Sequence, residues 1–91
     1  MDATATVKAD DERFRVTEWR LPPGTSTGWH VHELAYVVVP LTGGLMRIET
    51  PDGWIENPLT AGEPYSRPAG VEHDVHNGGD DEIVFIEVER R

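Results

Sequence analysis

The chain has 91 residues, no cysteine and a formal net charge of −9, from 17 Asp and Glu residues against 8 Lys and Arg residues. This length predicts one small domain, which buries only about 60–65% of its unfolded surface and gains little stability from its own core. Without cysteine, stability has to come from packing, a bound metal or a second copy of the chain. The acidity argues against binding to nucleic acid or to anionic membranes, which both require clustered cations.

The N-terminal segment MDATATVKADDE has no apolar stretch of the kind found in a secretory signal. No apolar run approaches the roughly 20 residues that a membrane-spanning helix needs. We therefore expect a cytoplasmic protein, a location with which the absence of cysteine agrees.

Seven prolines and nine glycines interrupt the chain too often for helices, and the runs between them are rich in β-branched and aromatic residues. We expect a loose N-terminal arm over residues 1–11, although Thr4–Val7 could pair onto a sheet edge, and then one domain over residues 12–91. The predicted strands are Glu12–Leu21, Gly28–Glu33, Ala35–Leu41, Leu45–Thr50, Trp54–Glu56, Pro64–Ser66, Val71–His76 and Ile83–Glu89. Eight short strands at this spacing predict an all-β antiparallel sandwich or barrel.

The segment 29–41, WHVHELAYVVVPL, contains two histidines separated by one residue. Strand alternation places His30, His32, Leu34, Tyr36 and Val38 on one face. The Cα atoms of the two histidines are then roughly 6–7 Å apart, so their ring nitrogens can converge on one ion. On its own, this pattern is more typical of a surface or partly buried pair than of a metal site.

A second segment, GEPYSRPAGVEHDVHN, makes the metal interpretation much stronger. It reads Gly62, five residues, Pro68, one residue, Gly70, two residues, His73, three residues and Asn77. This spacing resembles the second motif of the cupin family at every position.

The first cupin motif is a glycine, five residues, HxH, three or four residues, a glutamate, six residues and a glycine. Gly24, His30, His32 and Gly43 match this motif, but Tyr36 stands at the glutamate position. The two motifs together span more than half of the chain, which is therefore identified as a member of the cupin family.

The resemblance implies the cupin double-stranded β-helix, a small antiparallel jelly-roll barrel with one divalent transition metal near its open mouth. It makes His30, His32 and His73 the metal ligands, and it gives a structural role in turns to Gly24, Gly43, Gly62, Pro68, Gly70 and Asn77. Imidazole ligands bind Fe, Ni, Zn, Mn and Cu with affinities set chiefly by the metal, so the motif does not choose among them.

Replacement of the glutamate by Tyr36 leaves the ion with its full charge, which favours a small anionic ligand. Three-histidine centres of this kind occur in cupin dioxygenases. Tyr36 could be a phenolate ligand, because a metal lowers the pKa of a coordinated acid. It could also be a catalytic base, as a tyrosine is in the cupin dimethylsulfoniopropionate lyases, or an aromatic side chain that only packs.

Four other polar residues have weaker patterns. Arg15 and Arg47 are candidates for binding a substrate carboxylate, and the alternative for each is a solvated sheet face. Strand parity turns Glu33 away from the histidines and puts His76 on the face opposite His73.

The last strand is apolar on both faces, with Val84, Ile86 and Val88 on one and Ile83 and Phe85 on the other. In so small a domain we expect the second cover to be another copy of the chain, which predicts a homodimer.

Two functions remain open at this stage. The first is a mononuclear metal enzyme that acts on a small anionic metabolite, as a dioxygenase or as a metal-assisted isomerase or lyase. The second is a non-catalytic module that binds or senses a small ligand. The stretch TGWHVHELAYVVVPLTGG also resembles the small cupins associated with β-alanine degradation.

Overall fold

The computed structural model describes residues 3–91, and these residues form strands and loops with no helix. The strands in chain order are β1 (Thr4–Asp10), β2 (Phe14–Leu21), β3 (His30–Val31), β4 (Tyr36–Pro40), β5 (Gly44–Thr50), β6 (Gly53–Leu59), β7 (Tyr65–Arg67), β8 (Glu72–Asn77) and β9 (Ile83–Arg90). The described part of the chain therefore holds no helix of the length and apolar character needed to span a membrane.

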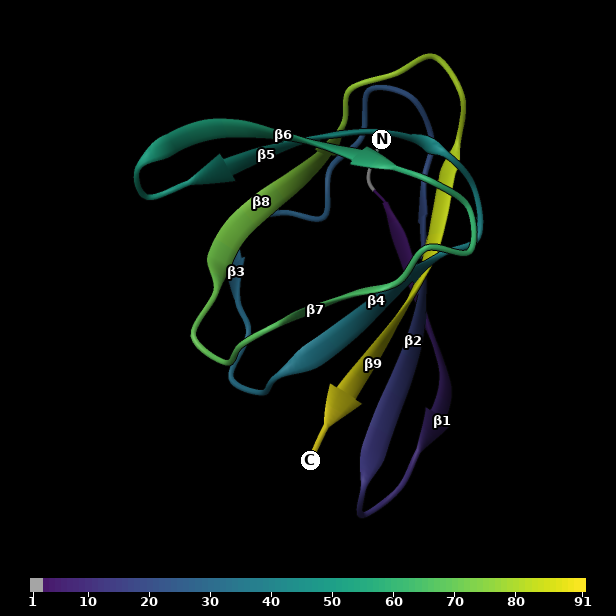
Figure 1. The fold of residues 1–91 in the computed structure, drawn as a ribbon, viewed down its shortest axis with the longest axis vertical. Helices are drawn as coiled ribbons and strands as arrows, with labels where there is room; N and C mark the ends of the chain where they lie inside the picture. The colour runs from purple at the N-terminus through teal and green to yellow at the C-terminus, as the bar shows by residue number, and fades with distance from the viewer. Residues whose placement is uncertain (1–2) are drawn as a thin grey trace.

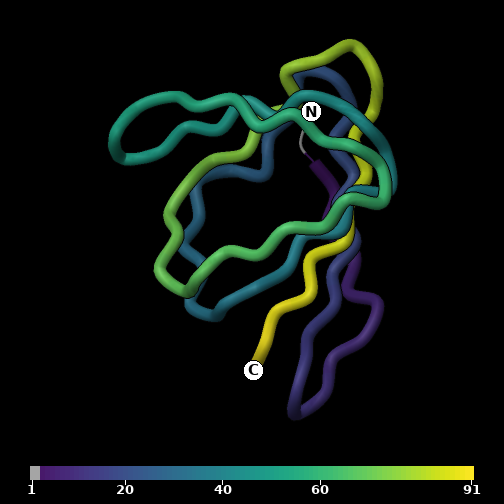
Figure 2. The backbone as a smooth tube through the Cα atoms, viewed as in Figure 1, coloured from purple at the N-terminus to yellow at the C-terminus, as the bar shows by residue number. Residues whose placement is uncertain are grey.

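The strands form two antiparallel sheets, one with the order β1-β2-β9-β4-β7 and the other with the order β3-β8-β5-β6. Figure 1 shows the two sheets facing each other, with the β1–β2 hairpin extending past one end and the β5–β6 hairpin past one side. The tube in Figure 2 shows how the chain passes from one sheet to the other and back, so that the sheets wrap around a common centre. The prediction of an all-β antiparallel barrel is confirmed.

The core fills the space between the sheets because each strand turns every second side chain inward. On β4 the inward residues are Tyr36, Val38 and Pro40, as the alternation predicts, and all three are buried. Each fully buried large apolar side chain contributes about 1.5–3 kcal/mol to folding. The core cluster consists of Leu21, Tyr36, Val38, Met46, Ile48, Leu59, Val75, Ile83 and Phe85.

Each of the eight predicted strands has a counterpart in β2–β9, and β3 and β6 differ most from the predicted lengths. Strand β3 has only two residues, and the chain leaves it at His32 before β4 begins at Tyr36. Strand β6 continues to Leu59 although it contains Pro58. Because β6 is an edge strand, the missing N–H of Pro58 removes no bond from the interior of the sheet.

The N-terminal segment is not a loose arm over the described residues; the alternative, pairing onto a sheet edge, is what the structure shows, and residues 1 and 2 lie outside the described range. Thr4–Asp10 forms β1, which pairs antiparallel with β2 and places Thr4 opposite Arg20. The alternation of short and β-branched residues in this segment suits an edge strand. All of β1 is exposed, so the strand is held by backbone pairing rather than by burial.

Three of the predicted turn glycines, Gly24, Gly62 and Gly70, have φ values of +78°, +79° and +95°. Gly43 does not have a positive φ; that conformation falls on Gly44, with φ +147°. A Cβ atom on Gly44 would lie 2.8 Å from Cγ1 of the fully buried Ile83, whereas one on Gly43 would meet only the Leu59 carbonyl oxygen, at 3.4 Å. The close approach of β5 to the core therefore depends on Gly44 rather than on the predicted Gly43.

Replacing Gly44 by Ala should lower the free energy of unfolding by about 2–3 kcal/mol, because it combines backbone strain with overpacking against Ile83. Gly43→Ala is the matched control and should cost less than about 1 kcal/mol. Urea denaturation followed by tryptophan fluorescence measures both variants. Equal losses of stability in the two would contradict this assignment.

Candidate metal centre

The three predicted histidine ligands are brought together by pairing between two segments far apart in the sequence. His30 on β3 lies directly opposite His73 on β8 in the antiparallel register. The N–H of His32 donates to the Val71 carbonyl oxygen at 2.8 Å, and the carbonyl oxygen of His32 accepts from the N–H of Gly70 at 2.7 Å. The turn that ends in Gly70 therefore fixes His32 beside the other two histidines.

The backbone also selects the tautomer of His30. Nδ1 of His30 lies 2.8 Å from the carbonyl oxygen of Gly28, which can only accept a hydrogen bond. Nδ1 therefore carries the proton, and Nε2 of the neutral ring offers its lone pair toward the site. Hydrogen bonds of this kind orient the imidazole ligands of many metal sites.

The donor nitrogens of His30, His32 and His73 all lie within 4.8 Å of one another. Nε2 of His30 is 3.0 Å from Nε2 of His32. Nε2 of His73 is fully buried and has no hydrogen-bond partner among the described residues. A buried ring nitrogen without a partner is costly unless it binds something else, and a metal ion suits a nitrogen flanked by two further imidazoles. The three residues therefore fit a divalent transition metal.

The two buried imidazoles are held in the neutral form that binds metals. Burial, and to a smaller extent the charge of His30, lowers the pKa of His32 to about 4. Burial, and to a smaller extent the charges of His30 and His32, lowers the pKa of His73 to about 4. Neutral rings with free lone pairs are therefore present throughout the neutral pH range.

Tyr36 lies against the histidines, as predicted, and contacts His32 through its ring. Its ring stacks on the His32 ring with centroids 3.8 Å apart and an angle of 18° between the planes. Burial, followed by the charge of Glu87, raises the pKa of Tyr36 well above its ordinary value. In the protein alone, the packed and protonated tyrosine is the favoured state.

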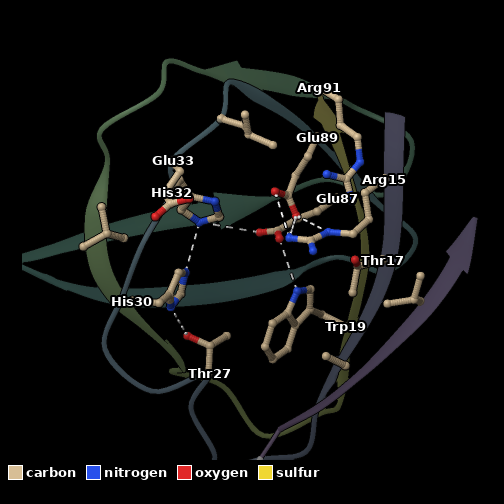
Figure 3. Close-up of a pocket in the computed structure, with 14 residues that line it drawn as sticks. Arg15, Thr17, Trp19, Thr27, His30, His32, Glu33, Glu87, Glu89 and Arg91 are labelled. Atoms are coloured by element: carbon tan, nitrogen blue, oxygen red, sulfur yellow. Dashed lines mark hydrogen bonds and ion pairs between the residues drawn. The ribbon is translucent and has the colours of Figure 1, made fainter. Parts of the chain in front are cut away.

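The histidines separate two cavities. The larger one, of about 550 Å³, is the mouth of the barrel and is lined by His30 and His32. The smaller one, of about 110 Å³, lies between the two sheets, mostly among apolar side chains, and is lined by Tyr36 and His73. Figure 3 shows the mouth, with His30 and His32 facing a group of polar side chains on the other wall, namely Arg15, Trp19, Glu87 and Glu89.

The two predicted substrate-binding arginines have different positions. Arg15 lines the mouth, as predicted, and its guanidinium holds Glu89 through both carboxylate oxygens at 3.1 and 3.2 Å. Arg47 is exposed and lies away from the mouth, with its guanidinium carbon 5.4 Å from the centre of the Trp54 ring. Arg47 pairs with His76 and not with a buried residue, so strand parity directs it outward and removes it from the candidate site.

Glu33 is exposed, as expected, but it lines the mouth together with His30 and His32, because β3 ends at Val31 and strand parity does not extend to it. The expectation for His76 agrees with the structure. His76 lies on the outer face of β8, where its Nε2 is 3.2 Å from a carboxylate oxygen of Asp74. Asn77 is the last residue of β8 and is buried, and its amide donates to the carbonyl oxygens of Leu21 and Asp81 at 2.8 Å each. Asn77 therefore closes the turn as predicted.

Glu87 is the polar residue of the site that the sequence patterns missed. Its side chain is buried on the inner face of β9 and borders both cavities. Burial, and to a smaller extent the charge of Glu89, raises the pKa of Glu87 to about 7. The available signal was parity, since Glu87 shares a face with Ile83 and Phe85, but the strand was interpreted as apolar on both faces.

Residues 17–89 match the family model of the cupin domain. This match covers most of the chain, which therefore belongs to the cupin family, and the double-stranded β-helix predicted from the two motifs is confirmed. The fold is similar to the crystal structure of a cupin domain from Bordetella pertussis. That protein is 53% identical to this chain, and the two structures superpose with a TM-score of 0.97 over 99% of this chain and 94% of the other.

The sequence is also similar to that of the beta-alanine degradation protein BauB of Pseudomonas aeruginosa. It is 52% identical over 87 residues, which cover 96% of this chain and 92% of the relative. The fold is also similar to that of the polyketide cyclase RemF from Streptomyces resistomycificus, with a TM-score of 0.78 and 27% identity, covering 97% of this chain and 64% of that one.

Acidification should destabilise the metal-free protein through its buried histidines. The unfolded chain binds protons at His73 below a pKa of 6.5, whereas the folded chain binds them only near pH 4, so stability is lost as the pH falls between these values. Glu87 acts in the opposite direction, because its pKa is raised on folding. A comparison with His73→Gln isolates the contribution of the histidine.

In a chelating buffer, the free energy of unfolding of the wild type should fall by about 1–2 kcal/mol more than that of His73→Gln between pH 7 and pH 5. Urea denaturation at the two pH values gives the difference. Parallel pH dependences would show that His73 is not buried in its neutral form.

Proposed function

We propose that this cupin binds one divalent transition-metal ion through His30, His32 and His73 and acts as an enzyme on a small anionic metabolite in the mouth cavity. The observation that carries the proposal is the buried Nε2 of His73, which has no hydrogen-bond partner in residues 3–91 and lies beside two other imidazoles. Two buried histidines and a half-buried third that face one another would be costly in a purely structural core.

A bound divalent ion would act as a Lewis acid toward the substrate, and a redox-active ion such as iron would add oxygen chemistry. The protein itself supplies a cavity of about 550 Å³ that fits a small metabolite. Arg15 lies in its wall with a partly exposed side chain and is the candidate to orient a substrate carboxylate. Tyr36, stacked on His32, is the candidate to hold or transfer a proton at its hydroxyl oxygen.

The resemblance to BauB supports a role in the breakdown of β-alanine or of a small carboxylate derived from it. Such a molecule has a carboxylate, which suits the charge of the centre, and it is small enough to enter a mouth of about 550 Å³. The reaction classes that remain are dioxygenation and metal-assisted isomerisation or elimination.

A second candidate function is a binding module without turnover. It is favoured by Tyr36, because this residue stands where the cupin motif has a glutamate and packs as a protonated tyrosine. Oxygen consumption and product formation with small carboxylates separate the two functions: the enzyme turns substrate over, whereas the module only binds it.

Protein purified without added metal should contain close to one equivalent of a transition metal, and His73→Ala should lose most of it. His76→Ala is the matched control, because it removes a histidine from the outer face of the same strand. Elemental analysis by plasma mass spectrometry measures all three proteins. Equal metal content in the wild type and His73→Ala would remove the site.

We also propose that the protein is a homodimer that pairs through the outer face of the five-stranded sheet. Strand register puts one group of β-branched side chains together on this face, and each of them remains partly exposed. The group, called here the valine patch, consists of Val16, Val37, Val39, Ile86 and Val88. A contiguous apolar face on so small a domain is typical of an interface.

Val37→Glu should convert the dimer to a monomer, because it places a charge in the middle of the valine patch. Val31→Glu is the control, since Val31 is an exposed valine of the other sheet. Light scattering after size-exclusion chromatography gives the mass of each protein. A wild type that is monomeric at micromolar concentration, or a Val37→Glu variant that stays dimeric, would contradict the interface.

A further inference from the structure

Glu87 has one carboxylate oxygen held and the other turned toward the histidines. The indole N–H of Trp19 donates to Oε1 at 3.2 Å. Oε2 lies 3.9 Å from Nε2 of His32 and accepts no hydrogen bond from the described residues. A carboxylate that binds a metal through one oxygen is commonly oriented by a hydrogen bond to the other, which is the arrangement seen here.

The distance between Glu87 and His32 suits two ligands of one ion. Donor atoms about 2.1 Å from a metal are at most about 4.2 Å apart, and neighbours in an octahedral shell are about 3.0 Å apart. The separation of 3.9 Å from Nε2 of His32 to Oε2 of Glu87 is within this limit, and the 3.0 Å between the nitrogens of His30 and His32 equals the value for neighbours.

Glu87 is not part of the tight group formed by the three imidazoles, whose donor atoms lie within 4.8 Å of one another. For all four groups to hold one ion, the carboxylate of Glu87 has to move toward the remaining imidazole nitrogens. Its side chain borders both the mouth, which His30 and His32 line, and the smaller cavity, which His73 lines.

The carboxylate of Glu87 also has no cationic side chain paired with it among the described residues. The neighbouring carboxylate of Glu89, in contrast, accepts hydrogen bonds from the guanidinium of Arg15 at both of its oxygens. Glu87 is more deeply buried, at 8% exposed, and forms no ion pair with Lys or Arg within residues 3–91. A buried carboxylate without a cation is unfavourable, and a divalent ion between it and the histidines would compensate the charge.

We propose that Glu87 is the fourth protein ligand of the metal and supplies, from the last strand, the carboxylate that the first cupin motif lacks at Tyr36. This inference rests on the proposed metal centre and makes it a three-histidine, one-glutamate site. A divalent ion then keeps one net positive charge, so the centre still attracts a carboxylate. Trp19 is a positioning residue that holds the glutamate through its indole N–H.

The test is a titration of metal-free protein with Co²⁺. Competition with a chromophoric chelator gives the affinity. The visible absorption of the Co²⁺ protein, recorded separately, depends on the number and type of its ligands. Glu87→Gln keeps the acceptor for Trp19 and removes the charged ligand, so its affinity for Co²⁺ should fall about 100-fold or more and its absorption bands should shift. Loss of a partner outside the ligand shell typically costs 10–100-fold, so the spectral shift separates a direct ligand from such a partner.

Glu72→Gln is the matched control. Glu72 also accepts an indole N–H, from Trp29 at 3.0 Å, and its loss removes the same charge from the outer face of β8. Its Co²⁺ affinity and spectrum should equal those of the wild type. Glu87→Asp retains a shortened carboxylate and should bind with intermediate affinity, which covers the case in which the Gln variant does not fold.

The possible failures are distinguishable. If the wild type binds Co²⁺ and Glu87→Gln binds it equally tightly with an unchanged spectrum, the assignment of Glu87 is wrong while the three-histidine site stands. If the wild type takes up no Co²⁺, both the metal centre and the role of Glu87 are overturned.

Discussion

The candidate centre depends on the pairing of two short segments, residues 28–32 and residues 70–73. His30 faces His73 across the β3–β8 ladder, and the backbone of His32 is tied at both its N–H and its C=O to Val71 and Gly70. A slip of one residue in this register would turn the imidazoles to the opposite face. The precision of the site is therefore a property of the backbone, and β3 needs only two residues to provide it.

This arrangement creates a tension between stability and function. A domain of 91 residues has a small core, yet it buries two histidines and a glutamate within that core. Each of these groups is disfavoured in a low-dielectric interior unless something compensates it. A metal ion that binds only the folded chain would stabilise it by mass action, so the site that weakens the empty barrel would strengthen the loaded one.

Much of the centre could be predicted because it follows from local periodicity and fixed spacings. Alternation put His30, His32 and Tyr36 inward, and the spacing from Gly62 to Asn77 identified the turn before His73. The all-β class followed from the short strands between turns, and the resemblance of the two motifs to those of the cupin family implied the double-stranded β-helix. These inferences need no knowledge of how distant strands pair.

The features that were missed depend on such long-range pairing. Whether Arg47 points in or out depends on the register of β5 against β8, and a one-residue error in strand phase reverses the answer. The pairing of Thr4–Asp10 with β2 was expected only as an alternative for Thr4–Val7, because it uses a free sheet edge that only the assembled barrel provides. Glu87 has an apolar residue on either side in the chain, and only the position of β9 between β2 and β4 turns it toward the histidines.

The central claim is that His30, His32 and His73 bind one ion together inside the barrel. X-ray absorption spectroscopy at the metal edge of the loaded protein tests it directly, because imidazole rings give a characteristic multiple-scattering pattern that can be counted. For zinc, the account predicts three imidazole nitrogens at about 2.0–2.1 Å. A shell with one imidazole or none, or one made only of oxygen atoms, would contradict it.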